Sequence, residues 1–191
     1  ITYFEGVEEW FDRINAYGKS NGLEIEHYVI SCGSKEIVDG SSIAKHFKRV
    51  FSNEFLFDES GQVVWPKVLV NYTTKTQYLF RIRKNLLDDL YDVVEINKRT
   101  AVDKIPFKNM IYVGDGFSDV PCMQIVFDKG GRAVSMYAPN NEKSRNEAIT
   151  LYNEKRVSSY MKADYRENSD IDKYIKKALV EISEELAQTS K

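Results

Sequence analysis

The residues with the strongest chemical signal lie in the segment 114–119, Gly-Asp-Gly-Phe-Ser-Asp. Asp115 follows the apolar run 110–113, which predicts a buried strand, and Asp119 lies four positions later, where a helix is expected to begin. Two carboxylates at one edge of a sheet suit Mg²⁺, which takes oxygen ligands and keeps several of its waters. The alternative is an Asp-Gly turn in which Asp119 caps the helix, a common arrangement. The residues alone leave both interpretations open.

Ser31, Cys32 and Gly33 form a second candidate site, after the short apolar strand 27–30 and before a predicted helix. A hydroxyl beside backbone N–H groups at the beginning of a helix can bind an anion. The alternative is an ordinary serine cap. Lys75 is expected in the first turn of a helix that begins after Thr74. A cation there opposes the helix dipole by about 0.3–1 kcal/mol, and a bound phosphate would remove the conflict, although a solvated lysine is the alternative.

The remaining reactive side chains are few. The two histidines, His27 and His46, have no matching ligand cluster, which argues against a histidine-based zinc site or a serine triad. The two cysteines, Cys32 and Cys122, have neither the number nor the spacing of a disulfide framework or a metal knuckle, which indicates reduced thiols in a cytoplasmic protein. Because the sequence pattern places no base near it, Cys32 is expected to be a small buried side chain rather than a nucleophile.

The composition of the chain is that of a folded domain. Its 191 residues are 42% hydrophobic and 29% charged, enough for a core and a solvated surface, which argues against disorder. The formal charge of −2 argues against a general nucleic-acid binder, which normally carries a basic surface. No apolar run approaches the roughly 20 residues that span a bilayer, so no membrane partner is expected.

The spacing of apolar residues predicts elements that alternate between strand and helix. Amphipathic helices are expected over 6–22 and 170–187, and a hairpin over 50–65 that turns at 58–61 and ends at Pro66. Further strands are predicted at 27–30, 110–113, 133–136 and 157–161, and further helices over 75–85, 118–127 and 140–153. The segment 35–47 is expected to be irregularly helical, with an interruption around Gly40. This alternation is typical of an α/β fold with a mostly parallel sheet, whose ligands bind at the carboxyl ends of the strands. We expect one domain, 1–187, with a frayed tail at 188–191.

Ser31, Lys75, Asp115 and Asp119, in this order, resemble the second, third and fourth motifs of the haloacid dehalogenase-like (HAD) hydrolase superfamily, most closely those of its phosphoserine phosphatase-like branch. The helix over 6–22 and the Asn-Glu-Phe-Leu-Phe segment at 53–57 also look like that branch. The similarity covers most of 1–185, and the Gly-Asp-Gly-x-x-Asp motif is its most specific part. It implies a Rossmann-like, mostly parallel sheet flanked by helices.

The resemblance also implies a function: a Mg²⁺-dependent phosphatase that hydrolyses a small phosphorylated metabolite through an aspartyl-phosphate intermediate. In such an enzyme Ser31 and the two residues after it would bind phosphate oxygens, and Lys75 would neutralise the phosphate and hold the nucleophile. Asp115 would coordinate Mg²⁺, and Asp119 would ligate the metal or support its shell. Ser31, Lys75 and Asp119 are therefore the expected catalytic residues.

The chain departs from the family at the first motif, an Asp-x-Asp near the start. Its one Asp-x-Asp, Asp170-Ile171-Asp172, opens the predicted closing helix and follows no apolar strand. Because the chain also begins at Ile1 without a methionine, we expect the nucleophile strand and a cap to precede it in a longer protein. The chain alone is then inactive, and it pairs with a second copy as a homodimer or with the missing segment. The alternative is a non-catalytic domain that binds phosphate or Mg²⁺ or serves as a scaffold.

Overall fold

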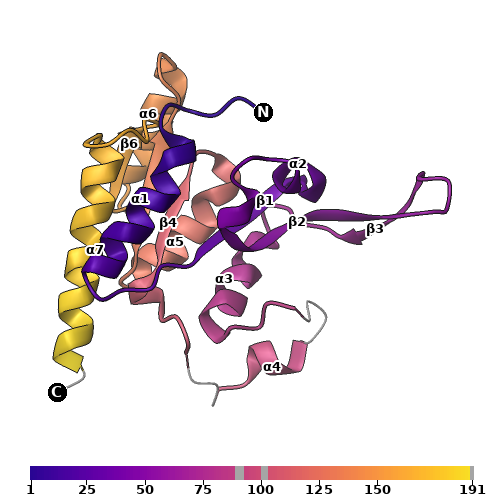
Figure 1. The fold of residues 1–191 in the computed structure, drawn as a ribbon, viewed down its shortest axis with the longest axis horizontal. Coiled ribbons are helices and arrows are strands. Elements are labelled where there is room, and N and C mark those ends of the chain that lie inside the picture. Colours follow the sequence, from indigo (N-terminus) through magenta and orange to yellow (C-terminus); the bar gives the residue numbers. More distant parts are fainter. Residues whose placement is uncertain (89–92, 100–102, 190–191) are drawn as a thin grey trace. The chain divides into compact units, whose positions relative to one another are not determined.

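The chain divides into two compact units, each with a sheet of its own (Figure 1). The computed structural model describes residues 1–88, 93–99 and 103–189. The first unit comprises Ile1–Ile25, Phe107–Gly116 and Met123–Lys191, and the second comprises Glu26–Pro106 and Phe117–Cys122. The tail predicted at 188–191 lies partly outside the described residues, and the closing helix continues to Thr189.

The first unit is built on a parallel sheet of three strands, in the order β4-β5-β6. β4 (Ile111–Gly114) pairs with β5 (Arg132–Tyr137), and β5 pairs with β6 (Ser159–Lys162). Its helices among the described residues are α1 (Val7–Ser20), α5 (Val120–Asp128), whose first three residues belong to the second unit, α6 (Glu142–Asn153) and α7 (Asp170–Thr189). β4 leads to β5 through α5, and β5 leads to β6 through α6, which is the connection that parallel neighbours need.

Helices cover both faces of this sheet. Val134 and Met136 of β5 belong to a core cluster with residues of α1 and α7: Trp10, Ile14, Ile171, Ile175 and Leu179. Ala133 belongs to a second cluster, with Met123 of α5 and partly buried residues that include Leu151 of α6. Neighbouring residues of β5 therefore serve opposite cores, as the two-residue period of a strand requires. The apolar spacing over 6–22 and 170–187 marks the buried stripes of α1 and α7, so these two helix predictions are confirmed.

The second unit holds a mixed sheet of three strands, in the order β1-β2-β3. β1 (His27–Ser34) runs parallel to β2 (Phe47–Phe57), and β3 (Val63–Val68) runs antiparallel to β2. The described helices of this unit are α2 (Lys35–Asp39), α3 (Lys75–Lys84) and α4 (Val93–Asn97), with short 3₁₀ turns at Ala44–His46 and Phe117–Asp119. α3 packs on the sheet: it contacts β1, and the Tyr78 ring stacks on the Phe51 ring of β2 with 4.7 Å between centroids.

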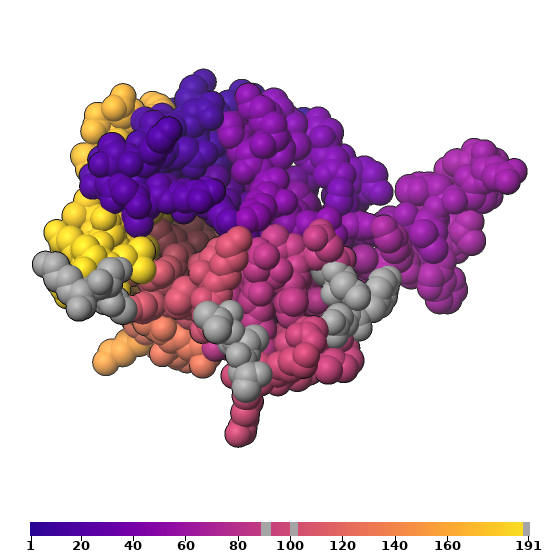
Figure 2. All heavy atoms as spheres, turned by 60° about the horizontal axis from the view of Figure 1, so that its bottom comes forward, coloured from indigo at the N-terminus to yellow at the C-terminus, as the bar shows by residue number. Residues whose placement is uncertain are grey.

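β2 and β3 form a hairpin whose tip extends away from the other elements of the second unit (Figure 2). The turn lies at 58–61, as predicted, and the Asp58 carboxylate accepts hydrogen bonds from the Ser60 and Gln62 N–H groups, each at 2.9 Å. Pro66 does not end the strand, as the sequence predicted, but lies inside β3. It is tolerated because β3 is an edge strand, where a missing N–H need not cost a bond in the sheet. Large side chains on the tip are exposed: Leu56, Phe57, Val63, Val64 and Trp65, the last at 68%.

The predicted α/β class, with a parallel sheet flanked by helices, is confirmed. Most elements lie within a few residues of the predicted ranges, and the largest extension is that of β1, which was expected to end at Ile30 and continues to Ser34. Within 1–88, 93–99 and 103–189, none of the helices combines the length and the apolar character that crossing a membrane needs.

Candidate functional site

Lys75 is the first residue of α3, as predicted, and the turn before it is ordered by Asn71. The Asn71 Oδ1 atom accepts hydrogen bonds from the Thr73 and Thr74 N–H groups, at 2.9 and 3.1 Å. The Thr73-Thr74 pair is a sequence signature of a helix cap, but the Thr74 hydroxyl accepts a hydrogen bond from the Asn71 N–H and makes no capping bond. An Asn side chain that bonds to the backbone two and three residues ahead stabilises a tight turn. Asn71 therefore positions Lys75.

The Lys75 ammonium is buried and binds Asp119. Lys75 Nζ lies 2.7 Å from Asp119 Oδ1, and it donates a longer hydrogen bond of 3.3 Å to the Ser118 hydroxyl. Only 4% of Lys75 and 7% of Asp119 is exposed. The two residues are 44 positions apart in the sequence and belong to different elements of the second unit, α3 and the 3₁₀ turn before α5. Two of the three residues expected to be catalytic are thus in direct contact.

This contact holds a positive charge in a fixed place. Burying a charge costs several kcal/mol, and the attraction to a partner repays the cost only when the geometry is good. Phosphoryl transfer depends on cations that are positioned in advance to neutralise the phosphate oxygens. An ammonium has three N–H donors, and the bonds from Lys75 to Asp119 and Ser118 use two of them. The arrangement can therefore offer a further donor to an anion.

Ser31, Cys32 and Gly33 lie in the same unit but in a different local structure from the one expected. They belong to the last part of β1, and the Ser31 hydroxyl accepts a hydrogen bond from the Gly33 N–H at 3.0 Å. The Asn53 side-chain amide donates to the Cys32 carbonyl at 2.6 Å, which ties this segment to β2. The helix that follows, α2, has only five residues, so the predicted helix N-terminus is weak. Cys32 is exposed and not a buried filler, and no disulfide joins it to Cys122. A phosphate-binding role for these three residues stays a prediction.

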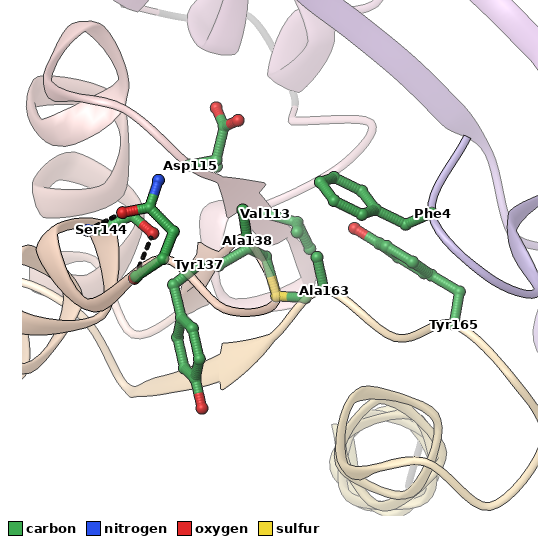
Figure 3. A pocket seen from close by; sticks show the side chains of 11 residues that line it. Phe4, Val113, Asp115, Tyr137, Ala138, Ser144, Ala163 and Tyr165 are labelled. Atoms are coloured by element: carbon green, nitrogen blue, oxygen red, sulfur yellow. Dashed lines mark hydrogen bonds between the residues drawn. The ribbon is translucent and has the colours of Figure 1, made fainter. Parts of the chain in front are cut away.

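Asp115 follows β4 directly in the first unit, and its side chain is exposed. It lines a cavity of about 350 Å³ at the carboxyl ends of β4 and β5. Figure 3 shows Phe4 and Tyr165 on one side of this cavity and Asp115 and Ser144 toward the other. Asn141 also lines it, and its side chain accepts a hydrogen bond from the Ser144 N–H at 3.1 Å, which caps α6. Carboxyl ends of parallel strands are where α/β folds bind ligands.

Tyr165 is held firmly as a wall of this cavity. Its N–H donates to the Glu5 carbonyl at 2.8 Å, its carbonyl accepts from Arg13 Nη2 at 2.6 Å, and its ring meets the Trp10 ring edge-on. Gly6 lets the two segments touch, because it has a φ of 80° and a Cβ there would lie 2.5 Å from the Arg166 nitrogen. Burial raises the pKa of Tyr165 to about 12, and the charge of Asp115 adds to the increase. The phenol therefore keeps its proton at neutral pH.

The expected Mg²⁺ site can be tested on the donors present. Within the described ranges no three His, Cys, Asp or Glu side chains gather as metal ligands. Mg²⁺ is commonly held by one or two carboxylates with waters and phosphate oxygens, so such a cluster is not required. Asp115 is exposed, and Asp119 contributes a carboxylate that pairs with Lys75. The donors therefore fit Mg²⁺ in kind, and further ligands would have to come from water or substrate.

The one Asp-x-Asp of the chain, at 170–172, has a structural role. Asp172 is fully buried in the first unit, where its carboxylate forms ion pairs with Arg13 at 3.1 Å and with Lys176 at 2.8 Å. It also accepts a hydrogen bond from the Asn168 N–H at 2.9 Å. Burial acts to raise the pKa of Asp172, but these partners outweigh it and hold the pKa below its usual value. Asp172 is therefore a buried anchor between α1 and α7, not a nucleophile.

The sequence analysis did not identify Asn71, which positions Lys75, or Phe4 and Tyr165, which line the cavity beside Asp115. Asn71 could have been found, because an Asn two residues before a Thr-Thr pair and a helix is a turn signal. Phe4 and Tyr165 carried no such signal, because an aromatic residue near the start of the chain and one after the last strand meet only in the folded unit.

The comparisons with known proteins give one distant relative and no family. An uncharacterized protein of Borreliella burgdorferi is 27% identical to this chain over 195 residues, which cover 92% of the chain and 66% of that protein. The chain thus spans just under two thirds of the length of that relative. No family model matches the chain, and no solved structure matches it.

Proposed function

We propose that this chain is part of a Mg²⁺-dependent phosphatase of the HAD-like superfamily, which hydrolyses a small phosphorylated metabolite through an aspartyl-phosphate intermediate. The observation that carries the proposal is the buried contact between Lys75 and Asp119. These residues were selected from sequence as two motifs of one phosphate site, 44 positions apart, and nothing in their local sequence required them to meet. Their contact supports a shared role.

A purely structural explanation of the pair is the weaker one. Replacing a buried ion pair by apolar side chains is often neutral or stabilising, so stability alone does not explain why a protein has such a pair. A phosphoryl-transfer site, by contrast, needs a lysine whose charge is held in place before the substrate arrives. Lys75 has the Asp119 carboxylate as its fixed partner and the Ser118 hydroxyl beside it. This arrangement suits a cation that neutralises a phosphate.

The proposed nucleophile would come from an additional strand. Within the described part of the chain, β1 pairs only with β2 and β4 pairs only with β5, so each sheet has an edge strand that can accept a further parallel strand. About one third of the relative from Borreliella burgdorferi lies outside the match, which leaves room for such a segment in a longer protein. We therefore expect the chain to need that segment for activity.

Mg²⁺ is part of the proposal through Asp115 and Asp119, the two carboxylates of the Gly-Asp-Gly-x-x-Asp motif. A bound Mg²⁺ would neutralise charge on the phosphate. The motif suggests Asp115, directly after β4, as one carboxylate ligand and Asp119 as the second carboxylate.

The test is hydrolysis of p-nitrophenyl phosphate by the full-length gene product and by this chain. We expect Mg²⁺-dependent release of nitrophenol by the full-length protein and none by the chain alone. Asp115→Asn and Lys75→Met should each abolish the activity, whereas Asp170→Asn removes one exposed carboxylate outside the motif and should leave it unchanged. A folded full-length protein without activity in Mg²⁺, on this ester and on a panel of phosphorylated metabolites, would refute the proposal.

One observation favours a second candidate, a non-catalytic domain that binds phosphate or Mg²⁺. Lys75 pairs with Asp119 directly, so the charge of this carboxylate is balanced within the chain itself. Calorimetric titration with inorganic phosphate and with Mg²⁺ separates the candidates: binding by a full-length protein that shows no turnover supports the second one.

A further inference from the structure

Asn53 lies in β2 at the position where this strand changes its pairing partner. Ser34 of β1 pairs with Asn53, whereas Val68 of β3 pairs with Glu54, the next residue. Asparagine is uncommon inside strands, because its short polar side chain competes for backbone hydrogen bonds. We therefore expect the bonds of its side chain, rather than strand propensity, to account for Asn53 at this place.

The Asn53 side chain bonds to the backbone on both sides of β2. Its amide nitrogen donates to the Cys32 carbonyl at 2.6 Å, and its Oδ1 atom accepts from the Val70 N–H at 2.6 Å. Because an N–H only donates and a carbonyl only accepts, these two bonds fix the amide in one orientation. All three residues belong to the second unit. Asn53 thus connects the end of β1 to the segment that follows β3.

The first of these two segments is a bulge at the end of β1. Ile30 is the last residue in regular register there, opposite Phe51. The next pair joins Ser34 to Asn53, so β1 advances four residues where β2 advances two. The residues between, Ser31–Gly33, form the bulge, and the bond to Asn53 holds its middle residue against β2. Bulges re-aim side chains and are frequent beside active sites.

The second segment leads from β3 to Lys75. β3 ends at Val68, and Asn53 holds the backbone two residues later at Val70, of which 3% is exposed. Asn71 follows at once and orders the turn that ends at Lys75, the first residue of α3. The place of the Lys75 ammonium depends on this path, and Asn53 fixes the point where the path begins.

We propose that Asn53 is a positioning residue of the candidate phosphate site: it holds the Ser31–Gly33 bulge and the segment leading to Lys75 at a fixed separation. The inference rests on the proposed function, in which these two parts bind one phosphate. The role is indirect, because Asn53 acts through the backbone that presents a hydroxyl on one side and an ammonium on the other. Phosphoryl transfer depends on such spacing, since a displacement of about 1 Å can slow a reaction about 100-fold.

The first test measures the order of the two segments by NMR relaxation of the backbone N–H groups in this chain. Asn53→Leu is close in size to the native side chain and removes both bonds. We expect the order parameters of Gly33 and Thr73 to fall from about 0.85, the value of a rigid backbone, to below about 0.6, and that of Leu79 inside α3 to stay high. A loss of stability alone leaves the order of the folded protein unchanged, and that result would overturn the inference.

Asn53→Asp separates the two bonds. A carboxylate still accepts from the Val70 N–H but cannot donate to the Cys32 carbonyl. Gly33 should therefore lose order while Thr73 keeps it. If Asn53→Leu does not fold, this variant decides alone: loss of order in both segments, or in neither, would overturn the inference.

The second test is hydrolysis of p-nitrophenyl phosphate by the full-length gene product in Mg²⁺. Asn53→Leu should lower kcat/KM about 100-fold, mostly through kcat, because the phosphate is held in a less productive geometry. Ser31→Ala should cost much less in the Asn53→Leu background than in the wild-type protein, since the hydroxyl has already lost its place. Strictly additive effects would show that Asn53 does not act through the bulge and would overturn the inference.

Asn97→Leu is the matched control in the same unit. The Asn97 amide donates to the Val93 carbonyl at 2.7 Å within α4, so the variant removes a side-chain bond that is local to one helix. It should leave the order parameters of both segments and the activity unchanged. Equal effects of Asn97→Leu and Asn53→Leu would show that the measurements report a general loss of stability, and the inference would fail.

The two tests keep this inference apart from the proposed function. An inactive wild-type protein would remove the proposed function, whereas the order parameters test the connection made by Asn53 without any substrate. Full activity of Asn53→Leu beside an active wild-type protein would overturn the inference and leave the proposed function standing.

Discussion

Because Lys75 and Asp119 form a buried ion pair, removing both charges should lower the free energy of unfolding less than removing either charge alone. At 2.7 Å and an effective dielectric constant of about 20, the attraction between the two charges is about 6 kcal/mol. Most of it offsets the loss of hydration. Lys75→Met leaves a buried carboxylate and Asp119→Leu leaves a buried ammonium, so each single variant should lower the free energy of unfolding by about 3–5 kcal/mol.

The double variant Lys75→Met/Asp119→Leu places two apolar side chains of similar volume in the same space. We expect it to be more stable than either single variant, because no uncompensated charge remains. Urea denaturation of the four proteins gives the coupling free energy directly. The coupling should persist at high salt, because buried charges are screened little. Additive single effects would show that the two side chains do not interact and would refute this account of the site.

The same double variant separates stability from chemistry. In the full-length protein it should fold and yet fail to hydrolyse a phosphate ester, since the positive charge has been removed. A stable double variant that keeps its activity would leave the ion pair without a catalytic role, whatever its coupling free energy.

Two further predictions concern each unit in turn. In the second unit, burial lowers the pKa of His27 to about 4, with a contribution from the charge of His46, whereas the unfolded chain keeps the ordinary value of about 6.5. The unfolded state therefore takes up a proton first as the pH falls, and between pH 7 and pH 5 the free energy of unfolding should decrease by about 2 kcal/mol more than in His27→Gln. Equal pH dependence in urea denaturation of the two proteins would contradict the burial of His27. In the first unit, Gly6→Ala should destabilise by about 2 kcal/mol or more, because it adds a clash with the Arg166 backbone to the strain of a positive φ. Gly22→Ala is the matched control, since Gly22 also has a positive φ but a Cβ there would meet no atom within 4 Å. It should lower the free energy of unfolding clearly less than Gly6→Ala does.

The parts of the fold that follow from local pattern could be predicted, and the parts that follow from distant contacts could not. α1 and α7 were predictable because a buried helix face leaves its period in the sequence. The sequence predicts that β1 ends at Ile30, because the apolar run stops there and Gly33 is unfavourable in strands, but pairing of Ser34 with Asn53 keeps the segment extended. The sequence predicts a strand end at Pro66, because it does not show that β3 lies at the edge of its sheet.

The candidate site shows the same division. The choice of Lys75 and Asp119 came from resemblance to a family, and the structure shows their contact without testing the function. The cavity could not be foreseen, because its walls join segments from both ends of the chain. Phe4 and Tyr165, for example, lie far apart in the sequence and line the same cavity. Such a site is specified by packing rather than by any single motif.

Pro66 has a consequence for how this molecule avoids aggregation. The exposed run Val63-Val64-Trp65 lies on an edge strand, which is the kind of surface on which other chains add as further strands. Proline lacks the N–H that an incoming strand would need as a donor at that position, so the ladder is interrupted one residue after Trp65. We therefore expect Pro66 to disfavour the addition of a further strand beside the exposed apolar side chains of the hairpin tip.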